Sequence, residues 1–377
     1  MTRRDFLGTT AALPAAAQVQ TAETGFTSLF DGQSLRGWDI VDGPESAFYV
    51  KDGAIVVHEG TGFPCWLRSE REYENFDFRG QYFIKGWMDS GIYIHAPEHG
   101  RPIWNGMQFH IFHNNVEQPQ ISSNGAILPV VPPLKINVRN KEEWNDFRIL
   151  MDWPRFQAWT NGELVQDIDL EKHPELRYRL RRGFLGFMSL SYPIRFRNLQ
   201  IRELPAKEKW QVLYGGPSDF DKWTLTQGGK AKYEPLGRVL HCDGNGSLAT
   251  LEKFKDFELR LYVRHDFQHN SGVLFRTGGD GLKSKHYYEI QLHDVEGSHY
   301  PTGSLYHHKR ATYPRIEAYQ WWPMHLIVKG PYCMVRINGE TVMEYEKLDV
   351  LEEGPIELQA HAPGRWTEFK DVRVKRL

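Results

Sequence analysis

An internal repeat is the strongest constraint in this sequence. "SGIYIHAP" begins at Ser90, and the similar "SGVLFRTG" begins 181 positions later, at Ser271. "MQFHIFHN" at 107 and "YEIQLHDV" at 288 keep the same spacing. "FRNLQIREL" at 196 and "FKDVRVKRL" at 369 lie slightly closer together, as small loop deletions would cause. A solenoid unit has roughly 20–50 residues, so this much longer period indicates two copies of a complete domain.

The repeat also predicts where the two domains begin and end. Both copies open alike, with "SLFDGQSLRGW" at 28 and "VLYGGPSDFDKW" at 212. We therefore expect a first domain over residues 26–204 and a second over 210–377, with the charged joint "PAKEK" at 205–209. A chain of 377 residues is long enough for two domains of roughly 100–200 residues each.

The first 24 residues predict an export signal and linker rather than a part of the fold. Arg3 and Arg4 precede Phe6 and Leu7, and an Ala-rich stretch with "PAAAQ" follows. This pattern resembles a bacterial twin-arginine signal with cleavage after Ala17; the alternative is a disordered tail. We expect a periplasmic or extracellular protein. No later segment has about 18 consecutive apolar residues, so we expect no membrane span.

Each copy has the sequence pattern of a β-sandwich. Short stretches such as "GIYIHA", "QFHIFH" and "FRILMDW" alternate apolar and polar residues and are separated by Gly, Pro, Asn and Asp. "WTNGEL" and "RINGET" place Asn-Gly between alternating stretches, which is a strong hairpin signal. No segment keeps a helical period. We predict an all-β fold in which each copy is a sandwich of two antiparallel sheets.

The composition of the chain indicates which classes of partner it can bind. The net charge is −2, which gives no reason to expect a nucleic-acid or anionic-membrane surface. Aromatic residues make up 13% and include 12 Trp, a content that suits both large sandwich cores and stacking on sugar rings. The three cysteines, Cys65, Cys242 and Cys333, match no disulfide framework or CxxC metal motif.

Alternation along two strands of each copy separates a polar face from an apolar face. The expected core face of the two copies holds Ile92, Ile94, Phe109, Ile111, Val273, Phe275, Ile290 and Leu292. The opposite face holds Tyr93, His95, Gln108, His110 and Phe112 in the first copy and Leu274, Arg276, Glu289, Gln291 and His293 in the second. A solvated face is usually rich in Lys, Thr and Glu, so this set favours a ligand-binding face.

Histidines are concentrated in the second copy. They are His286, His293, His299, His307 and His308, with Asp294 and Glu296 nearby. Imidazole and carboxylate groups could ligate a divalent metal or act as acid and base. No fixed-spacing metal motif is present, so a metal cofactor stays open. "SLYHHKR" reads as a strand end running into a loop that could bring Tyr306 and His307 over a cleft, where the first copy has the apolar "AILPVVPP".

Several of these stretches together resemble the 3-keto-disaccharide hydrolase domain family. They are "SLFDGQSLRGW", "NSGVLFR", "YYEIQLHD", "PTGSLY", "INGETV", "GPIELQAH" and "EFKDVRVKRL", with "DSGIYIH", "EEWNDFRI" and "WTNGELV" in the first copy. The resemblance implies two tandem concanavalin-like jelly rolls. It also implies an exported enzyme that cleaves glycosides oxidised at C3. A base removes the C2 proton, the C1 group leaves by β-elimination, and water addition gives net hydrolysis.

The resemblance assigns candidate residues position by position. Glu289, Gln291 and Asp294 match the family's YE-x-Q-x-x-D strand, and Arg276 matches the Arg that ends the preceding strand. We expect His293 or Glu289 as base, with Arg276 and Gln291 as oxygen donors and Tyr306 and His307 contacting substrate. The first copy offers an alternative set, which is Gln108 with His95, His110 and His113. Which copy is catalytic stays open, as do the glycoside, elimination versus hydrolysis, and the oligomeric state.

A non-catalytic tandem lectin is the competing interpretation, since concanavalin-like sandwiches also bind glycans without chemistry. Surface tryptophans would serve that function, and Trp66, Trp104, Trp321 and Trp322 are the candidates. In a third interpretation, one copy is catalytic and the other orients a longer glycoside.

Overall fold

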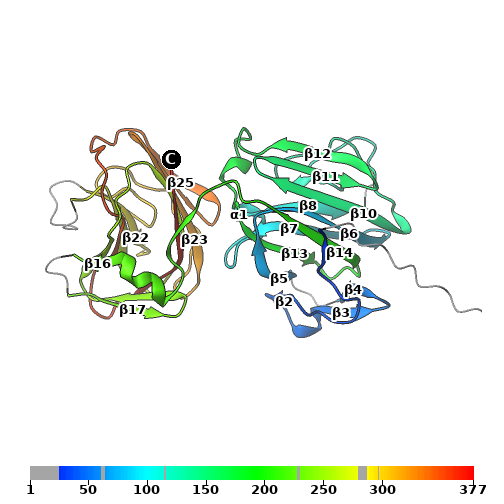
Figure 1. Ribbon diagram of the computed structural model, residues 1–377, viewed down its shortest axis with the longest axis horizontal. Coiled ribbons are helices and arrows are strands. Elements are labelled where there is room, and N and C mark those ends of the chain that lie inside the picture. Colours follow the sequence, from blue (N-terminus) through cyan, green and yellow to red (C-terminus); the bar gives the residue numbers. More distant parts are fainter. Residues whose placement is uncertain (1–24, 61–63, 114–115, 227–229, 279–286, 296) are drawn as a thin grey trace, which may run out of the picture.

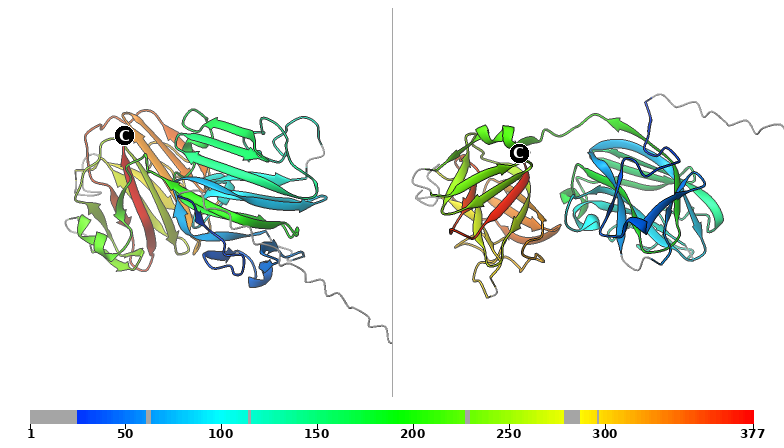
Figure 2. Two further views of the ribbon diagram at one scale, coloured as in Figure 1. Left: turned by 45° about the vertical axis from the view of Figure 1, so that its right-hand side comes forward. Right: turned by 90° about the horizontal axis from the view of Figure 1, so that it is seen from below.

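The computed structural model describes residues 25–60, 64–113, 116–226, 230–278, 287–295 and 297–377. In these ranges the chain forms two β-sandwiches that lie side by side, joined by the segment between β14 and β15 (Figures 1 and 2). The predicted all-β fold of two tandem jelly-roll sandwiches is confirmed. The export signal expected in residues 1–24 lies outside the described residues. Among the described residues no helix has the length and apolar character needed to cross a membrane.

The first sandwich consists of two sheets, named here the β6 sheet and the β8 sheet. In spatial order, the β6 sheet contains β12 (Glu163–Asp169), β11 (Arg155–Thr160), β10 (Lys141–Asp152), β6 (Asn75–Lys85), β14 (Arg195–Leu204), β4 (Ala54–Val57) and β3 (Phe48–Lys51), with β1 (Thr27–Ser28) paired to β14. The β8 sheet contains β2 (Trp38–Val41), β5 (Cys65–Tyr73), β13 (Gly183–Ser189), β7 (Asp89–Ala96), β8 (Met107–Phe112) and β9 (Ile127–Leu128). Three short helical turns lie between strands of this sandwich: η1 (Glu45–Ala47), α1 (Pro102–Asn105) and η2 (Leu176–Tyr178).

The second sandwich consists of the β20 sheet and the β22 sheet. The β20 sheet contains β17 (Lys232–Leu236), β18 (Val239–Asp243), β27 (Thr367–Arg376), β20 (Phe257–His265), β23 (Trp322–Lys329), β24 (Tyr332–Ile337) and β25 (Glu340–Tyr345), with β15 (Gln211–Tyr214) paired to β27. The β22 sheet contains β16 (Trp223–Leu225), β19 (Gly246–Thr250), β26 (Glu357–Ala360), β21 (Asn270–Phe275) and β22 (Tyr288–His293). The turn η3 (Pro217–Lys222) leads into β16.

The two sandwiches have the same strand order, so the sequence repeat is a repeat of structure. The order β12-β11-β10-β6-β14-β4-β3 matches β25-β24-β23-β20-β27-β18-β17. The shared opening motif also forms the same hydrogen bond in both halves. The indole Nε1 of Trp38 donates to the carbonyl oxygen of Leu29 at 2.7 Å, and that of Trp223 donates to the carbonyl oxygen of Leu213 at 2.9 Å.

Both Asn-Gly pairs turn hairpins, as the sequence predicts. Asn161 and Gly162 join β11 to β12 with φ of 50° and 80°, and Asn338 and Gly339 join β24 to β25 with φ of 51° and 81°. A two-residue turn with both φ values positive matches the twist of the flanking strands, and Asn and Gly adopt it at little cost.

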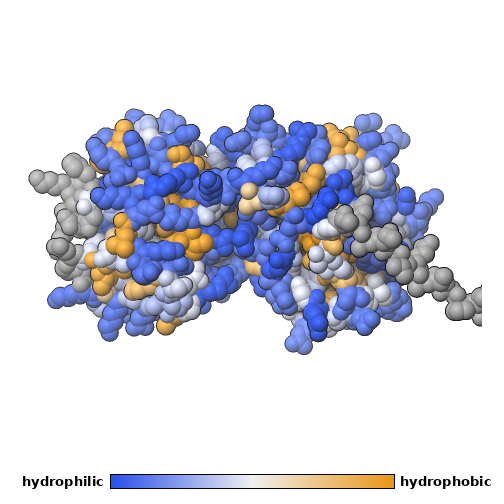
Figure 3. All heavy atoms as spheres, in the orientation of Figure 1, coloured by the Kyte–Doolittle hydropathy of each residue, from blue (hydrophilic) through white to orange (hydrophobic). Residues whose placement is uncertain are grey.

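The apolar core of each half lies between its two sheets. All eight residues expected on the core face of their strands are fully buried there. Cys65, Cys242 and Cys333 are also buried and have free thiols. On the face drawn in Figure 3, hydrophilic residues predominate and apolar ones are scattered. Sandwich burial therefore fixes which side of each strand faces outward.

The outer faces of the β6 and β20 sheets carry matched clusters of basic side chains around one buried acid. Arg79, Arg148 and Arg202 surround Asp77, and Arg260, His325 and Lys375 surround Glu258. In the first half the arginine side chains are 31–41% exposed. In the second half the three basic side chains are only 10–17% exposed, because the first half covers that face.

The two halves meet through polar contacts on the outer face of the β20 sheet. Glu98, which follows β7, receives hydrogen bonds at 3.0 Å from Lys370 and Arg238, and its backbone N–H donates to the Tyr262 hydroxyl at 2.9 Å. A cavity of about 440 Å³ lies in the same interface. Burial alone would raise the pKa of Glu98, but the hydrogen bonds from His99 and Lys370 hold that pKa far below its usual range.

We predict that Glu98 stabilises this contact only when ionised. The lowered pKa means that its contribution is present above the ordinary glutamate value of 4.5 and is lost as the pH falls below it. Glu98→Gln should therefore lower the free energy of unfolding by about 1 kcal/mol at pH 7, after allowing for solvent screening. Thermal unfolding from pH 7 to pH 3 should show the deficit shrinking. A deficit that is constant with pH, or equal to that of the exposed control Glu353→Gln, would contradict the role.

Candidate functional site

A stripe of polar side chains runs along the outer face of β22. Glu289, Gln291 and His293 alternate with Ile290 and Leu292, which pack in the core. Glu289 and Gln291 are only 4% and 5% exposed, whereas His293 is half-buried. The carboxyl group at one end of the stripe is therefore shielded from solvent, and the imidazole at the other end is more accessible. Reactive groups in enzyme sites are commonly shielded from bulk water in this way.

Glu289 is the carboxyl group of the stripe, and its pKa is strongly shifted. Its side chain lies over Gly272 on the neighbouring strand β21, where a Cβ atom would overlap the carboxylate. Burial raises the pKa of Glu289 to about 7, and a hydrogen bond with Gln359 on β26 partly opposes that rise. A carboxyl group that titrates near neutral pH can both take up and release a proton under physiological conditions.

The other two members of the stripe are held by neighbouring side chains. Gln291 Nε2 donates to Asn270 Oδ1 at 2.7 Å. His293 Nδ1 lies 3.0 Å from the hydroxyl oxygen of Ser298, and burial lowers the pKa of His293. At neutral pH both are therefore uncharged groups, fixed in place by a partner on one side.

The segment after β22 folds back beside the stripe. Leu305 bridges both Ile290 and Lys309, and the N–H of Tyr306 donates to the carbonyl oxygen of Glu289 at 2.9 Å. The expected strand end and loop is thus a tight turn along the sheet edge. Tyr306 is the half-buried cross-strand neighbour of Glu289, while His307 is exposed, with its ring centroid 4.0 Å from that of Tyr306.

The first copy keeps this geometry but lacks the acid. Gln108 lies over Gly91 as Glu289 lies over Gly272, and Leu128 on β9 faces Gln108. His110 Nε2 lies 3.0 Å from Asp89 Oδ1, which repeats the contact between Gln291 and Asn270. An aromatic cluster fills the adjacent face, where Trp66, Tyr93 and Phe184 are each at most 8% exposed. His113 is half-buried at the end of β8.

Comparison with known families agrees with this duplicated site. The family model described as the 3-keto-alpha-glucoside-1,2-lyase-like domain matches residues 25–202 and again 209–375. The chain belongs to this family. Membership marks it as a carbohydrate-active protein with two copies of the family domain.

Solved structures match one copy at a time. Two candidate glycosyl hydrolases of Parabacteroides distasonis share 22% and 21% identity, cover 48% of this chain and 94% and 99% of their own, and give TM-scores of 0.42 and 0.41. The carbohydrate binding module CBM66 from Bacillus subtilis shares 14% identity over 41% of this chain and 95% of its own, with a TM-score of 0.31. Comparison with curated proteins returned no match.

Two residues expected to face a ligand are structural instead. Arg276, just after β21, and His95, the second-last residue of β7, occupy matched positions, and both have a positive φ, of 53° and 52°. That backbone conformation ends the alternation and turns each side chain inward. The Arg276 guanidinium binds Asp256 Oδ1 and the carbonyl oxygens of Lys255, Gly330 and Val350 at 2.9–3.2 Å. His95 nitrogens lie 2.9 and 2.7 Å from the carbonyl oxygens of Leu180 and Glu74.

The tryptophans offered as sugar-stacking residues are not on an open surface. Trp66 and Trp322 are buried, at 4% and 1% exposure. Trp321 is half-buried between the halves, where its ring stacks on that of His99 with centroids 6.0 Å apart. Trp104 is half-buried and contacts Gly339 of the second half. These four tryptophans fill cores and the contact between the domains.

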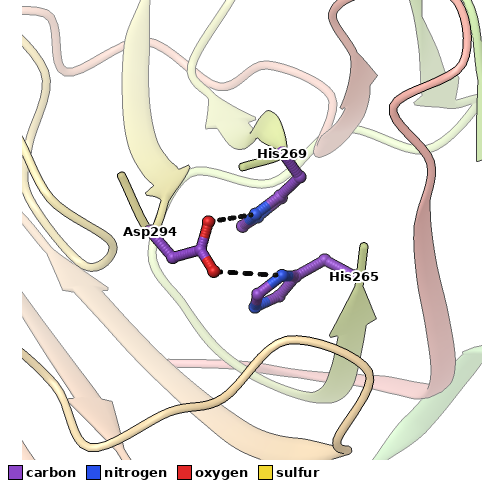
Figure 4. Close-up of side chains that lie close together, drawn as sticks. All are labelled: His265, His269 and Asp294. Carbon is purple, nitrogen blue, oxygen red and sulfur yellow. Dashed lines mark hydrogen bonds and ion pairs between the residues drawn. The ribbon is translucent and has the colours of Figure 1, made fainter. Parts of the chain in front are cut away.

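Asp294 also faces inward, because it continues the alternation past His293. Its Oδ1 lies 3.1 Å from His269 Nδ1, and its Oδ2 lies 3.6 Å from His265 Nδ1 (Figure 4). Sequence reasoning missed both histidines, since they precede the histidine-rich stretch. His286 and Glu296, which were counted in that stretch, lie outside the described residues.

Sequence reasoning also missed the part that β26 plays in the site. Glu357 and Gln359 alternate with Leu358, whose side chain lies in the core, and Gln359 hydrogen-bonds Glu289 on the opposite, outer face of the sheet. Thr277 donates its hydroxyl proton to the Glu357 carboxylate. The stretch "GPIELQAH" carried the same alternation signal as β22 and could have identified this strand.

We predict that Arg276 acts on stability rather than on substrate. Arg276→Met leaves Asp256 and three carbonyl oxygens without their buried cation, which should lower the free energy of unfolding by about 3 kcal/mol. Chemical denaturation measures this loss. At temperatures where the variant stays folded, sugar binding should be unchanged. If the variant kept normal stability but lost sugar binding, Arg276 would belong to the ligand-binding face after all.

Proposed function

We propose that this chain is an exported enzyme that cleaves the glycosidic bond of 3-keto-glycosides at the Glu289 stripe of its second copy. The observation that carries the proposal is a shielded carboxyl group with a pKa near 7 on the outer face of a family domain. Proton abstraction next to a ketone at neutral pH needs such a base.

The reaction follows from the acidity of the C2 hydrogen, which the C3 ketone increases. Glu289 takes the C2 proton, and the electron pair of the C–H bond forms the enolate. The enolate collapses with formation of the C1–C2 double bond and loss of the C1–O bond. The leaving oxygen takes a proton and departs as an alcohol. Addition of water across the double bond then gives net hydrolysis.

The neighbours of Glu289 supply the polar contacts that this reaction needs. Tyr306 lies across from Glu289 on the sheet edge, and Gln291 and His293 follow along β22. Their O–H and N–H groups can hydrogen-bond the C3 oxygen as negative charge develops and donate to the leaving oxygen. His293, whose pKa is lowered, is mostly neutral at pH 7 and suits a donor or positioning role better than that of a cation.

The difference between the copies supports assigning the chemistry to the second. An amide cannot remove a proton from carbon, and the first copy has Gln108 where the second has Glu289. Leu128 likewise stands where the second copy has Tyr306. The first copy is then a structural or substrate-orienting domain.

We predict that Glu289→Gln lowers kcat for a chromogenic 3-keto-glucoside by about 10²-fold or more, since it removes the base but keeps the size of the side chain. The unoxidised parent glucoside should release no product with either protein. For the parent enzyme, the rate should rise with pH through about 7 and level off above it, because only the ionised carboxylate accepts the proton.

The matched control is Gln108→Ala in the first copy, which should keep the parent kcat. Stability separates lost chemistry from lost folding. A raised folded-state pKa means that ionising Glu289 destabilises the fold as the pH rises, so Glu289→Gln should be at least as stable as the parent at pH 8. Full turnover by Glu289→Gln would remove Glu289 from the reaction. Glycan binding without product release by the parent would favour the lectin function.

A further inference from the structure

The cluster of His265, His269 and Asp294 is buried at one end of the second sandwich. His265 ends β20, His269 precedes β21, and Asp294 follows β22, so the cluster joins the β20 sheet to the β22 sheet (Figure 4). Both histidine side chains are fully buried, and their rings stack with centroids 3.6 Å apart. Donor atoms of the three side chains lie within 4.8 Å of one another.

Hydrogen bonding leaves this cluster unsatisfied. The carboxylate of Asp294 can only accept, so His269 donates its Nδ1 proton and keeps the lone pair on Nε2. His265 Nδ1 lies 2.9 Å from the carbonyl oxygen of Asp266, which fixes the same tautomer. Among the described residues, the Nε2 atoms of both rings are buried without a hydrogen-bond partner. The two Nδ1 atoms and the Asp294 carboxylate face one another, and a cation between them would take the place of the ring protons there.

The first copy shows that the fold itself does not need these polar groups. At the matched positions of the repeat it has Ile84, Met88 and His113. Ile84 and Met88 are buried in the apolar core, at 0% and 5% exposure. The same end of the same sandwich thus holds two buried apolar side chains and His113 in one copy, and two histidines and an aspartate in the other.

The donor set selects a type of ion. Two neutral imidazoles and one carboxylate suit Zn²⁺ and related divalent transition ions, whereas Ca²⁺ and Mg²⁺ prefer oxygen ligands throughout.

We propose that His265, His269 and Asp294 form a binding site for a divalent transition ion such as Zn²⁺. The ion clamps the end of β20 to the β21–β22 hairpin. The opposite face of that hairpin carries Asn270, Gln291 and His293, so the clamp fixes one end of the polar stripe. The proposal concerns metal binding alone and is independent of the reaction proposed for Glu289.

The test uses the full chain without a histidine tag. After treatment with a chelator and dialysis against Zn²⁺, elemental analysis should find one zinc ion per chain. Excess Zn²⁺ should raise the Tm by about 5 °C. Co²⁺ should give the visible absorption bands of a nitrogen-ligated site. The variant H265I/H269M, which carries the residues of the first copy, should fold but lose the ion, the Tm shift and the bands.

Two further variants keep the result interpretable. Asp294→Asn preserves size but removes the charged ligand and should weaken Zn²⁺ binding at least tenfold. His58→Ala removes an exposed histidine of the first half and should change nothing. Zinc stoichiometry near zero in the parent, or equal binding by the parent and H265I/H269M, would overturn the proposal and leave the cluster as a hydrogen-bonded triad only.

Discussion

Burial of two apolar sheet faces against each other is the constraint on which the rest of the molecule depends. In each half it locks one set of alternate side chains inward, and it thereby sets the direction of the others. Ile290 and Leu292 are fully buried, and their burial is what turns Glu289, Gln291 and His293 outward together. A shift of one residue in this register would turn the whole stripe toward the core and its apolar neighbours toward the outer face.

The two copies show how much chemistry can change while this constraint holds. In the second copy Glu289 lies over Gly272, and at the matched positions of the first copy Gln108 lies over Gly91. The strands are paired in the same way in both copies. His265 and His269 stand where the first copy buries Ile84 and Met88. Buried ionisable groups are costly, and apolar residues suffice at the same point of the same fold. The polar groups of the second copy are therefore not required by the fold.

The sequence predicted what alternation and local turn chemistry control. The repeat, the core faces of β7, β8, β21 and β22, and both Asn-Gly hairpins follow from patterns a few residues long. The same reasoning was wrong for Arg276 and His95, because a positive φ at each of these residues turned its side chain out of the alternation. The pairing of His265 with Asp294 depends on how two sheets close on each other, and no local pattern encodes it. The prediction of surface tryptophans was wrong because composition does not show whether an aromatic side chain faces the core or the solvent.

The contact between the copies is heterologous: it joins loops of the first to the outer face of the β20 sheet. Such a contact joins different surfaces of the two copies and does not close on itself. In principle the same joint could repeat from one molecule to the next. Charge opposes this, because three arginines surround Asp77. Around Glu258 one of the three bases is His325, whose pKa burial lowers to about 3, so it is neutral and easier to desolvate. Burying the exposed cluster around Asp77 would therefore cost more desolvation free energy than burying its counterpart around Glu258.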